Sequence, residues 1–469
     1  MQELNSGKSR PGLKIDRLML KKYDRPGPRY TSYPTVPEWS GEFTTEDYLG
    51  ALDGASSATD PLSMYVHIPF CKSRCYYCGC NTCIVRGDDK PGRYIDALAR
   101  EIKMIGGRLG RRNNLIQLHW GGGTPTYLDE KQIEQLFEAI IGNFTLEDDA
   151  EVAIEVDPRV TSIPQLELLR RLGFNRISLG VQDLTPQVQK AIGRDQTLEQ
   201  TEELFDHSRR LGFGGINIDL IYGLPLQTVR DFSATVDHVV RMGADRVAVY
   251  SYAHLPSLKA HQRKIKETDL PGPEQKFELF ATAVERFLTA GYIQIGMDHF
   301  ARPDDELAQA LGNGTLHRNF MGYTTKRTGD MLGVGMSAIG NISGAFAQNL
   351  SGLDSYMNTI GEGKPAIYRG YQLSGDDHIR QAVIISIMCN FVLKFDDLKK
   401  AFGIDYFGYF RQEDEELEVF IGDGLMKRTG NGIEVCPEGR IFVRNIAMVF
   451  DAYLRKHRDG DKPLFSRTI

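Results

Sequence analysis

Five of the seven cysteines in this chain of 469 residues lie within one short stretch, from Cys71 to Cys83. Cys71, Cys75 and Cys78 are separated by three residues and then by two, so one loop carries three thiols. An odd count argues against a disulfide framework, and a structural zinc site needs a fourth ligand, usually from a second pair that does not follow downstream. Thiolates are the usual ligands of iron–sulfur clusters. The spacing therefore favours a 4Fe–4S cluster with one iron open to a substrate or cofactor, with zinc as the alternative.

Short apolar runs alternate with helical patterns between residues 61 and 255. The expected strands are Ser63–Ile68, Leu115–Trp120, Glu151–Val156, Arg176–Gly180, Gly215–Ile221 and Arg246–Ser251. The expected helices are Tyr94–Gly106, Glu130–Ile141, Ile163–Leu172, Thr197–Leu211 and Val229–Met242. This alternation predicts a parallel sheet, either doubly wound or closed part-way into a barrel. In both folds the reactive residues follow the carboxyl ends of the strands, as the cysteines do here.

Several residues suited to a ligand site follow the other predicted strands. Gly122, Gly123 and Thr124 come after the second strand, and glycine lets the backbone approach a ligand closely, although a triple glycine is more often a tight turn. Glu155 ends the third strand, Gln182 follows the fourth and Asp219 lies in the fifth: each alone is explained equally well as a cap or a surface residue. Their shared strand end is the position of a barrel active site.

The two ends of the chain differ from its middle, and we expect a division into residues 1–55, 56–375 and 376–469. Residues 1–35 carry eight basic and three acidic side chains, a balance of +5. Near the end of this stretch, Pro26, Pro28 and Pro34 predict an extended arm. That arm suits a solvated tail, a packing strap or a lid whose arginines meet carboxylates. Residues 376–469 predict a small helical domain with a strand pair, in the order of a winged helix. Nucleic-acid binding is disfavoured because residues 401–450 hold nine acidic and five basic side chains.

The composition describes a globular protein. Hydrophobic residues make up 41%, and 56 basic against 62 acidic side chains give a net charge of −6, which offers no general attraction to nucleic acid or anionic membranes. The polar start of the chain is not a secretory signal, and no apolar run reaches the roughly 20 residues of a membrane-spanning helix. Thiols kept reduced point to the cytoplasm.

The cysteine motif, with Tyr77 before its last cysteine, resembles that of radical S-adenosylmethionine (SAM) enzymes. The wider sequence resembles one branch of that superfamily, the oxygen-independent coproporphyrinogen III oxidases. The strings that carry the resemblance are Pro26–Thr35, Tyr65–Cys71, Cys78–Asn81, His119–Thr126, Asn217–Pro225, Tyr252–Pro256, Met297–Leu307 and His317–Phe320. The cysteines alone identify the superfamily, whereas these strings together identify the branch.

The resemblance implies a fold, a reaction and partners. The fold is a partial (β/α)6 barrel with an extended N-terminal arm and a winged-helix-like C-terminal domain. The reaction is radical SAM oxidative decarboxylation of two propionates of coproporphyrinogen III to vinyl groups, giving protoporphyrinogen IX. It uses a 4Fe–4S cluster and two SAM molecules, of which the cluster-bound one yields a deoxyadenosyl radical. An external donor such as flavodoxin or ferredoxin supplies the electron, and the enzyme is expected to be a monomer.

The resemblance also assigns roles to residues. The cluster ligands are Cys71, Cys75 and Cys78, and the catalytic residues are Cys80 and Tyr65. The residues implied to bind cofactor are Tyr65, Tyr77, Cys78, Gly79, Gly122, Gly123, Thr124, Glu155, Gln182, Arg194, Asp219, Ala253 and Ile339. Met321 stands where the family has a glutamine, and methionine does not replace the hydrogen bonds of an amide, so occupancy of the second SAM site is open.

The basic arm suggests where the substrate binds. Arg25 and Arg29 are candidates to meet its carboxylates, and Tyr30 to pack on the macrocycle. One alternative is a haem-binding or haem-trafficking relative, but such relatives lack this arm and have phenylalanine at the Cys80 position. A second alternative, a radical SAM enzyme that methylates or opens a tetrapyrrole, stays open because of Met321 and Cys83.

Overall fold

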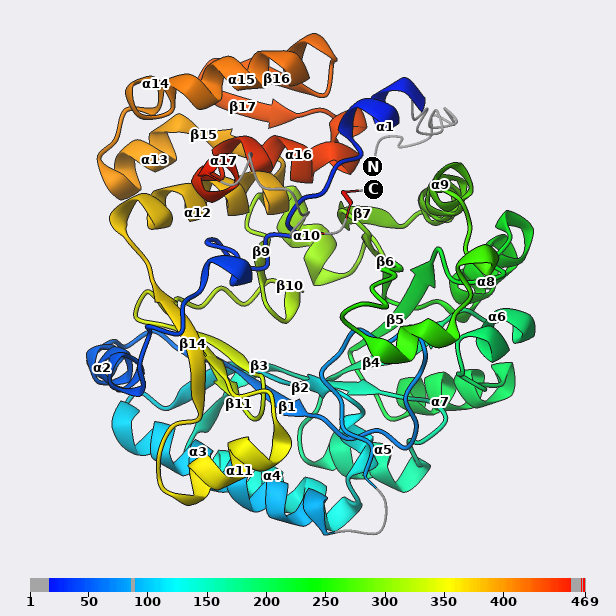
Figure 1. Ribbon diagram of the computed structural model, residues 1–469, viewed down its shortest axis with the longest axis vertical. Coiled ribbons are helices and arrows are strands. Elements are labelled where there is room, and N and C mark those ends of the chain that lie inside the picture. The colour runs from blue at the N-terminus through cyan, green and yellow to red at the C-terminus, as the bar shows by residue number, and fades with distance from the viewer. Residues whose placement is uncertain (1–16, 86–88, 457–464, 466, 469) are drawn as a thin grey trace, which may run out of the picture.

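The computed structural model describes residues 17–85, 89–456, 465, 467 and 468. The first part of the basic arm, with Lys8, Arg10 and Lys14, lies outside these residues. Six parallel strands lie side by side in chain order at the centre of the sheet, so the predicted βα alternation is confirmed (Figure 1). They are β1 (Leu62–Ile68), β2 (Asn114–Gly122), β3 (Thr145–Val156), β4 (Arg176–Gln182), β5 (Gly215–Tyr222) and β6 (Arg246–Ser251).

Helices connect these strands and bury their apolar faces against the sheet. They are α3 (Lys90–Leu109), α4 (Glu130–Ile141), α5 (Ile163–Arg171), α6 (Pro186–Ala191), α7 (Leu198–Arg210) and α8 (Val229–Met242). Three of them begin with a reciprocal capping box, for example at α4, where the Asp129 carboxylate accepts from the backbone N–H of Gln132 and the Gln132 side chain accepts from that of Asp129. Such caps fix where a helix begins.

The sheet extends past the six predicted strands at both edges. The first edge carries β11 (Met331–Val334), parallel to β1, and then β12 (Ile339–Ile342), β13 (Ala345–Asn349) and β14 (Ile367–Gln372), which run antiparallel. The other edge carries β8 (His299–Ala301) and β7 (Ile293–Gly296). These strands are short. A Cβ on Gly333 would lie 2.4 Å from the carbonyl group of Ile339, so β11 and β12 can approach this closely only because position 333 is glycine.

The remaining helices and hairpin of the middle segment surround this extended sheet. They are α9 (Pro273–Thr289), α10 (Glu306–Asn313), the hairpin of β9 (His317–Asn319) and β10 (Gly322–Thr324), and α11 (Leu353–Gly361). The buried carboxylate of Glu101 on α3 joins the segment from β11 to α11 to the helices around the central strands. It accepts from the Gly335 N–H at 2.8 Å, the Asn349 amide at 2.7 Å and the Tyr356 hydroxyl at 2.6 Å.

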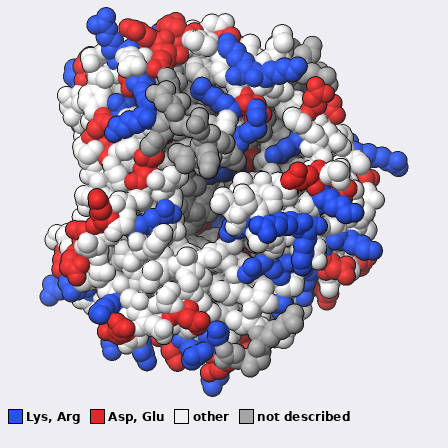
Figure 2. Space-filling model, in the orientation of Figure 1, with Lys and Arg blue, Asp and Glu red and all other residues white. Residues whose placement is uncertain are grey.

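The chain from residue 375 forms a helical unit around a three-stranded sheet. Its elements are α12 (Gly375–Asn390), β15 (Val392–Lys394), α13 (Phe395–Phe402), α14 (Tyr406–Tyr409), α15 (Arg411–Gly422), β16 (Met426–Thr429), β17 (Gly432–Val435), α16 (Val443–Ala447) and α17 (Ala452–Lys456). This matches the winged-helix-like order expected from the sequence. Figure 2 shows a hollow between this unit and the barrel. The division at residues 55 and 375 stays a prediction.

The arm packs on the C-terminal unit. The described part of the arm begins with α1 (Arg17–Tyr23), a helix that the sequence did not predict. It continues without helix through Pro26, Pro28 and Pro34, and the chain then leads to α2 (Thr45–Ala55). The Tyr30 hydroxyl donates to Asp451 at 2.9 Å, and the amide of Asn445 donates to the Tyr23 carbonyl at 2.8 Å. Near the end of the chain, the Thr468 N–H donates to the Arg25 carbonyl at 2.9 Å, so the arm and Thr468 lie side by side next to Arg444 of α16.

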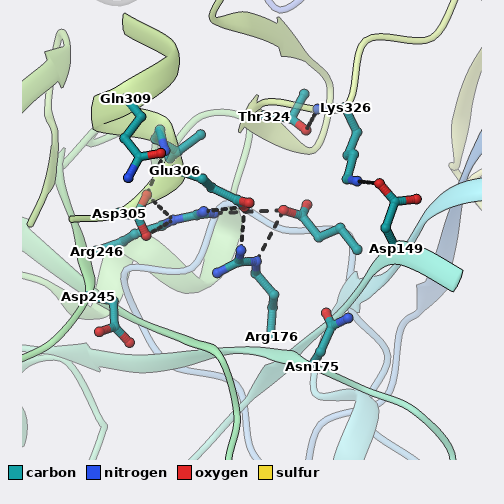
Figure 3. Close-up of polar contacts among 12 residues, drawn as sticks. Asp149, Asn175, Arg176, Asp245, Arg246, Asp305, Glu306, Gln309, Thr324 and Lys326 are labelled. Atoms are coloured by element: carbon teal, nitrogen blue, oxygen red, sulfur yellow. Dashed lines mark hydrogen bonds and ion pairs between the residues drawn. The ribbon is translucent and has the colours of Figure 1, made fainter. Parts of the chain in front are cut away.

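An ion-pair network closes the amino end of the barrel strands (Figure 3). Arg176 and Arg246 are the first residues of β4 and β6, and both donate to Glu306 at the start of α10. Arg246 also pairs with Asp305 at 2.9 Å, and Arg176 pairs with Glu151 of β3 at 3.3 Å. Every arginine here therefore has carboxylate partners.

Candidate active site at the carboxyl ends of the strands

The cysteine loop, residues 69–83, follows β1 and folds back on itself. The Cys83 N–H donates to the Pro69 carbonyl at 2.7 Å, and the Cys71 N–H donates to the Cys83 carbonyl at 3.1 Å. The Tyr76 N–H donates to the Ile192 carbonyl at 2.8 Å, which ties the loop to the segment after α6. Backbone pairing at Cys83 therefore closes the loop that presents Cys71, Cys75 and Cys78, and this requires no thiol at position 83.

Cationic and hydroxyl groups face two of the three thiols, those of Cys75 and Cys71. Arg159 and Arg194 donate to the Cys75 sulfur at 3.6 and 3.8 Å, and both pair with Asp157, at 2.6 and 3.2 Å. The Thr124 hydroxyl lies 3.5 Å from the Cys71 sulfur. Guanidinium groups beside thiolates lower the cost of gathering negative charge in a buried site. Arg159 and Asp157 were missed in the sequence, where they read as an ordinary loop.

The donor set fits a cubane cluster. Across the described residues, no three His, Cys, Asp or Glu side chains converge on one point that suits a single metal ion. A tetrahedral zinc site requires such convergence. A 4Fe–4S cluster does not, because each thiolate binds its own iron at a separate corner. The three cysteines do not converge on one point, and two arginines lie beside Cys75. This arrangement suits the cluster that the spacing predicted.

The glycine run after β2 lets two loops pack closely. A Cβ on Gly123 would lie 2.6 Å from the backbone carbonyl group of Pro69, and one on Gly122, whose φ is 115°, would lie 2.6 Å from the His67 ring. The Gly123 N–H donates to Ile68 and the Thr124 N–H to Phe70, both at 2.8 Å. These glycines position the cysteine loop, and their predicted contact with SAM stays a prediction.

Glu155 and Asp219 line one cavity inside the barrel, together with Met321. Glu155 accepts from the Gly122 N–H at 3.1 Å and lies 3.2 Å from His119 Nε2; although burial opposes ionisation, these contacts lower the pKa of Glu155. Burial, and then the charge of Glu155, raise the pKa of Asp219 to about 6. The structure thus brings together two carboxylates that the sequence placed on separate strands.

Tyr65 belongs to a hydrogen-bonded chain on β1. His67 Nε2 lies 3.0 Å from the Asn81 carbonyl, which only accepts, so this nitrogen carries the proton. Burial lowers the pKa of His67, and in the neutral ring Nδ1 therefore accepts from the Tyr65 hydroxyl at 3.0 Å. The Tyr65 ring also stacks on His119, with ring centroids 6.0 Å apart. Tyr65 is held between the cysteine loop and β2.

Gln182 and Arg194 lie at the end of β4. Gln182 has a φ of 70° and is buried, a strained backbone that marks the turn out of the strand. Arg194 donates to the Gly180 carbonyl at 2.5 Å as well as to Asp157, so its guanidinium is fixed between the strand and the cysteine loop.

The residues predicted for a second SAM site fall into two groups. Gln262 donates to the carbonyls of Tyr77 and Ala253, at 2.9 and 3.3 Å, and so joins the cysteine loop to the loop after β6. Ile339 packs instead against the cluster that contains Trp39, beside the hairpin that bears Met321. Gly79 has open space around its Cα. Cys80 is exposed, and its thiol hydrogen-bonds to Cys78, which lowers the pKa of Cys78 to about 6.

Two family models match the chain. Residues 65–239 match the radical SAM superfamily, and residues 373–442 match the HemN C-terminal domain. The chain is 46% identical to an oxygen-independent coproporphyrinogen III oxidase of Escherichia coli (strain K12) over 458 residues, which cover 97% of this chain and 98% of the relative. The chain belongs to the oxygen-independent coproporphyrinogen III oxidase family.

Further comparisons agree with this family. A relative of the same name from Pseudomonas aeruginosa is 45% identical over 459 residues, covering 97% of this chain and 99% of that protein. A solved structure described as "Coproporphyrinogen III oxidase (HemN) from Escherichia coli is a Radical SAM enzyme" superposes with a TM-score of 0.89 at 45% identity, over 94% of this chain and all of that chain. The fold and the enzyme class expected from the sequence are therefore confirmed, and membership of the superfamily implies a 4Fe–4S cluster and SAM. Within the described residues, no helix has the length and apolar character needed to span a membrane.

Proposed function

We propose that this chain removes two propionate carboxyl groups from coproporphyrinogen III and leaves vinyl groups, giving protoporphyrinogen IX in haem biosynthesis. Family membership supports the reaction, and one observation in the structure carries it: the three thiols and the polar residues of β2 to β5 lie at the same end of the strands. When bound, a reduced 4Fe–4S cluster and SAM supply the hydrogen-atom abstraction that acid–base groups cannot perform.

The residues around the cysteines bind and orient in this proposal. Cys71, Cys75 and Cys78 hold the cluster, and Arg159 and Arg194 balance its negative charge. Glu155, Gln182, Asp219, Gly122, Gly123 and Thr124 orient SAM. Tyr65 stays fixed by His67 beside the cluster, and Cys80, which is exposed, faces the substrate as the catalytic thiol.

A second SAM molecule is part of the proposal, bound by Tyr77, Cys78, Gly79, Ala253 and Ile339. The bridge from Gln262 to Tyr77 and Ala253 supports that site on one side. Met321 replaces an amide with a thioether on the barrel side, so we expect the second molecule to bind more weakly than the first.

The substrate carboxylates are proposed to meet the basic arm. Arg29 pairs with Asp298, lies over the Tyr250 ring at 5.7 Å and lines a cavity beside β6. Arg25 is exposed. Tyr30 is buried with its hydroxyl on Asp451, so here it fastens the arm to the C-terminal unit, and its contact with the macrocycle stays a prediction.

The electron donor is proposed to be a small acidic carrier of the flavodoxin or ferredoxin kind. Residues 254–266 hold four basic side chains and no acidic one, and this loop touches the cysteine loop. His261 donates to the Cys78 carbonyl at 2.7 Å, and Lys264 lies over the Tyr76 ring at 4.6 Å. An acidic partner would thus be attracted to the loop nearest the cluster. We place the reaction in the cytoplasm, where thiols stay reduced, and expect a monomer.

The proposal is tested by an anaerobic assay of the reconstituted chain with dithionite, SAM and coproporphyrinogen III. The expected products are protoporphyrinogen IX and two CO₂ per tetrapyrrole, identified by mass spectrometry. A methylated or ring-opened product would replace this reaction with another, and haem binding without turnover would indicate a trafficking protein. Stoichiometric zinc with no iron would overturn the cluster itself.

A further inference from the structure

A cavity of about 500 Å³ lies where the arm, the end of β6, α9 and the C-terminal unit meet. Among the described residues, its wall carries four cationic side chains and one carboxylate, namely Arg29, Lys276, Arg444, Arg467 and Asp298. The Tyr250 side of this cavity leads toward the site, because Tyr250 also lines the cavity inside the barrel that holds Glu155 and Asp219. The cavity therefore adjoins the place where SAM is proposed to bind.

Two of the four cations are already neutralised. Arg29 pairs with Asp298, which is buried and is the carboxylate that the described part of the chain contributes to the wall. Arg467 pairs with Asp24 at 2.6 Å. Lys276 and Arg444 remain to be accounted for.

Lys276 has neutral partners within the described residues. Its Nζ donates to the Tyr252 carbonyl at 3.1 Å and lies 5.9 Å from the centroid of the Tyr222 ring, and it forms no ion pair there. Burial lowers the pKa of Lys276, while the charges of Asp24 and Arg467, which pair with each other, act on it in opposite directions. An ammonium group has three N–H donors, so two of them are available to a ligand in the cavity.

Arg444 has backbone carbonyls for partners. It donates to Pro28 at 2.9 Å, to Arg467 at 3.3 Å, to Thr468 at 3.2 Å and to Gly27. The side chain is buried, and within the part of the chain that is described no carboxylate pairs with it. Arg444 thus holds the arm and Arg467 and Thr468 together beside the cavity. It also adds to the wall a positive charge that no carboxylate of the described residues pairs with.

Cations that are partly or wholly withdrawn from water, as half-buried Lys276 and buried Arg444 are, cost free energy when no carboxylate pairs with them, and a ligand carboxylate would offset that cost. We propose that Lys276 binds one carboxylate of the tetrapyrrole substrate in this cavity, in the positive field of Arg444. This rests on the proposed function, which supplies a substrate with four carboxylates. It assigns to α9 and the C-terminal unit a part in substrate binding that the sequence placed only in the arm.

The test measures binding rather than turnover. Coproporphyrin III, the air-stable oxidised macrocycle with four carboxylates, is titrated into the reconstituted chain and followed by fluorescence, with deuteroporphyrin IX, which has two, as the reference. Lys276→Met is expected to weaken coproporphyrin binding about tenfold, as the loss of one charge-assisted hydrogen bond predicts, and deuteroporphyrin binding by less. Lys276→Arg keeps the charge and is expected to stay within about threefold of the parent. Lys131→Met, on the exposed face of α4, is the matched control and leaves both affinities unchanged.

The outcomes separate this inference from the proposed function. If the parent chain does not bind coproporphyrin III, the proposed substrate is wrong and the Lys276 site falls with it. If the parent binds and Lys276→Met binds equally well, the substrate stands and the Lys276 site is wrong. Should Lys276→Met fail to fold, Lys276→Gln, which keeps a donor for the Tyr252 carbonyl, replaces it with the same expected loss.

Discussion

The two ends of the barrel treat charge in opposite ways. At the amino end, Arg176 and Arg246 are matched by Glu151, Asp305 and Glu306 (Figure 3). At the carboxyl end, Asp219 has a raised pKa, Lys276 has neutral partners among the described residues, and the Cys75 thiol faces two guanidinium groups. Paired charges close the amino end, whereas the carboxyl end combines pairs such as that of Arg194 and Asp157 with a cation, Lys276, that no carboxylate of the described residues pairs with.

The largest effect is expected from the cluster ligands. Alanine at Cys71, Cys75 or Cys78 removes one of three corners that hold the iron, so bound iron and the charge-transfer absorbance of the cluster should be lost. Cys83→Ala is the control, because position 83 closes the loop through its backbone N–H and carbonyl and should keep its iron. Loss of iron in Cys83→Ala and retention in Cys75→Ala would reverse the assignment.

Gly123→Ala tests the packing that presents the cysteines. The added Cβ would meet backbone atoms of Pro69 at 2.6 Å, and backbone does not yield as a flexible side chain does, so iron content should fall severalfold. Gly79→Ala adds the same methyl group to the cysteine loop itself, where nothing lies within 4 Å, and should keep its iron. Equal iron content in the two variants would show that the glycine run serves another purpose.

Asp219 gives the carboxyl end a pH dependence. Its pKa of about 6 lies above the value of about 3.9 in an unfolded chain, so the folded chain binds this proton more tightly. The free energy of unfolding therefore falls as the pH rises between those values, by on the order of 1–3 kcal/mol.

Asp219→Asn removes that titration. Its stability relative to the parent, measured by urea unfolding of the cluster-free chain at several pH values, should rise from about pH 4 to about pH 7 and then level off. A difference between the two chains that does not change with pH would contradict the raised pKa.

The smallest effect is expected at the paired end. Glu306→Gln removes the carboxylate shared by Arg176 and Arg246, but Glu151 and Asp305 remain, so stability should fall by about 1–2 kcal/mol. Turnover per folded molecule should be unchanged, because Glu306 does not line the cavity that holds Glu155 and Asp219, and its partners Arg176 and Arg246 keep the carboxylates of Glu151 and Asp305. Glu362→Gln, in an exposed pair with Lys364, is the control and should cost less than about 0.5 kcal/mol in urea unfolding. A loss of turnover in Glu306→Gln would show that the two ends are coupled.

The sequence predicted the parts of the fold that repeat. Alternating apolar runs and helical patterns located β1 to β6, because long elements with one buried face leave a clear period. The strands β7, β8 and β11 to β14 were not identified, since strands of three to six residues in a segment rich in glycine carry too short a pattern. The helix α1 was missed because the prolines that follow it dominated the interpretation of the arm.

The site was predicted unevenly for a similar reason. The cysteine spacing is local, so it was visible in the sequence, and Glu155 and Asp219 were found because parallel strands share an end. Asp157, Arg159 and Lys276 were not found, since their roles depend on contacts between segments far apart in the chain. Lys276, for example, reaches Tyr252 only when α9 packs beside β6.

The central claim is that the carboxyl end of the barrel removes a hydrogen atom from each reacting propionate. Coproporphyrinogen III deuterated on the propionate carbon attached to the ring tests it most directly, because forming a vinyl group requires loss of a hydrogen from that carbon. We predict that each CO₂ released is matched by one 5′-deoxyadenosine carrying one deuterium. Release of CO₂ with unlabelled deoxyadenosine would contradict the account.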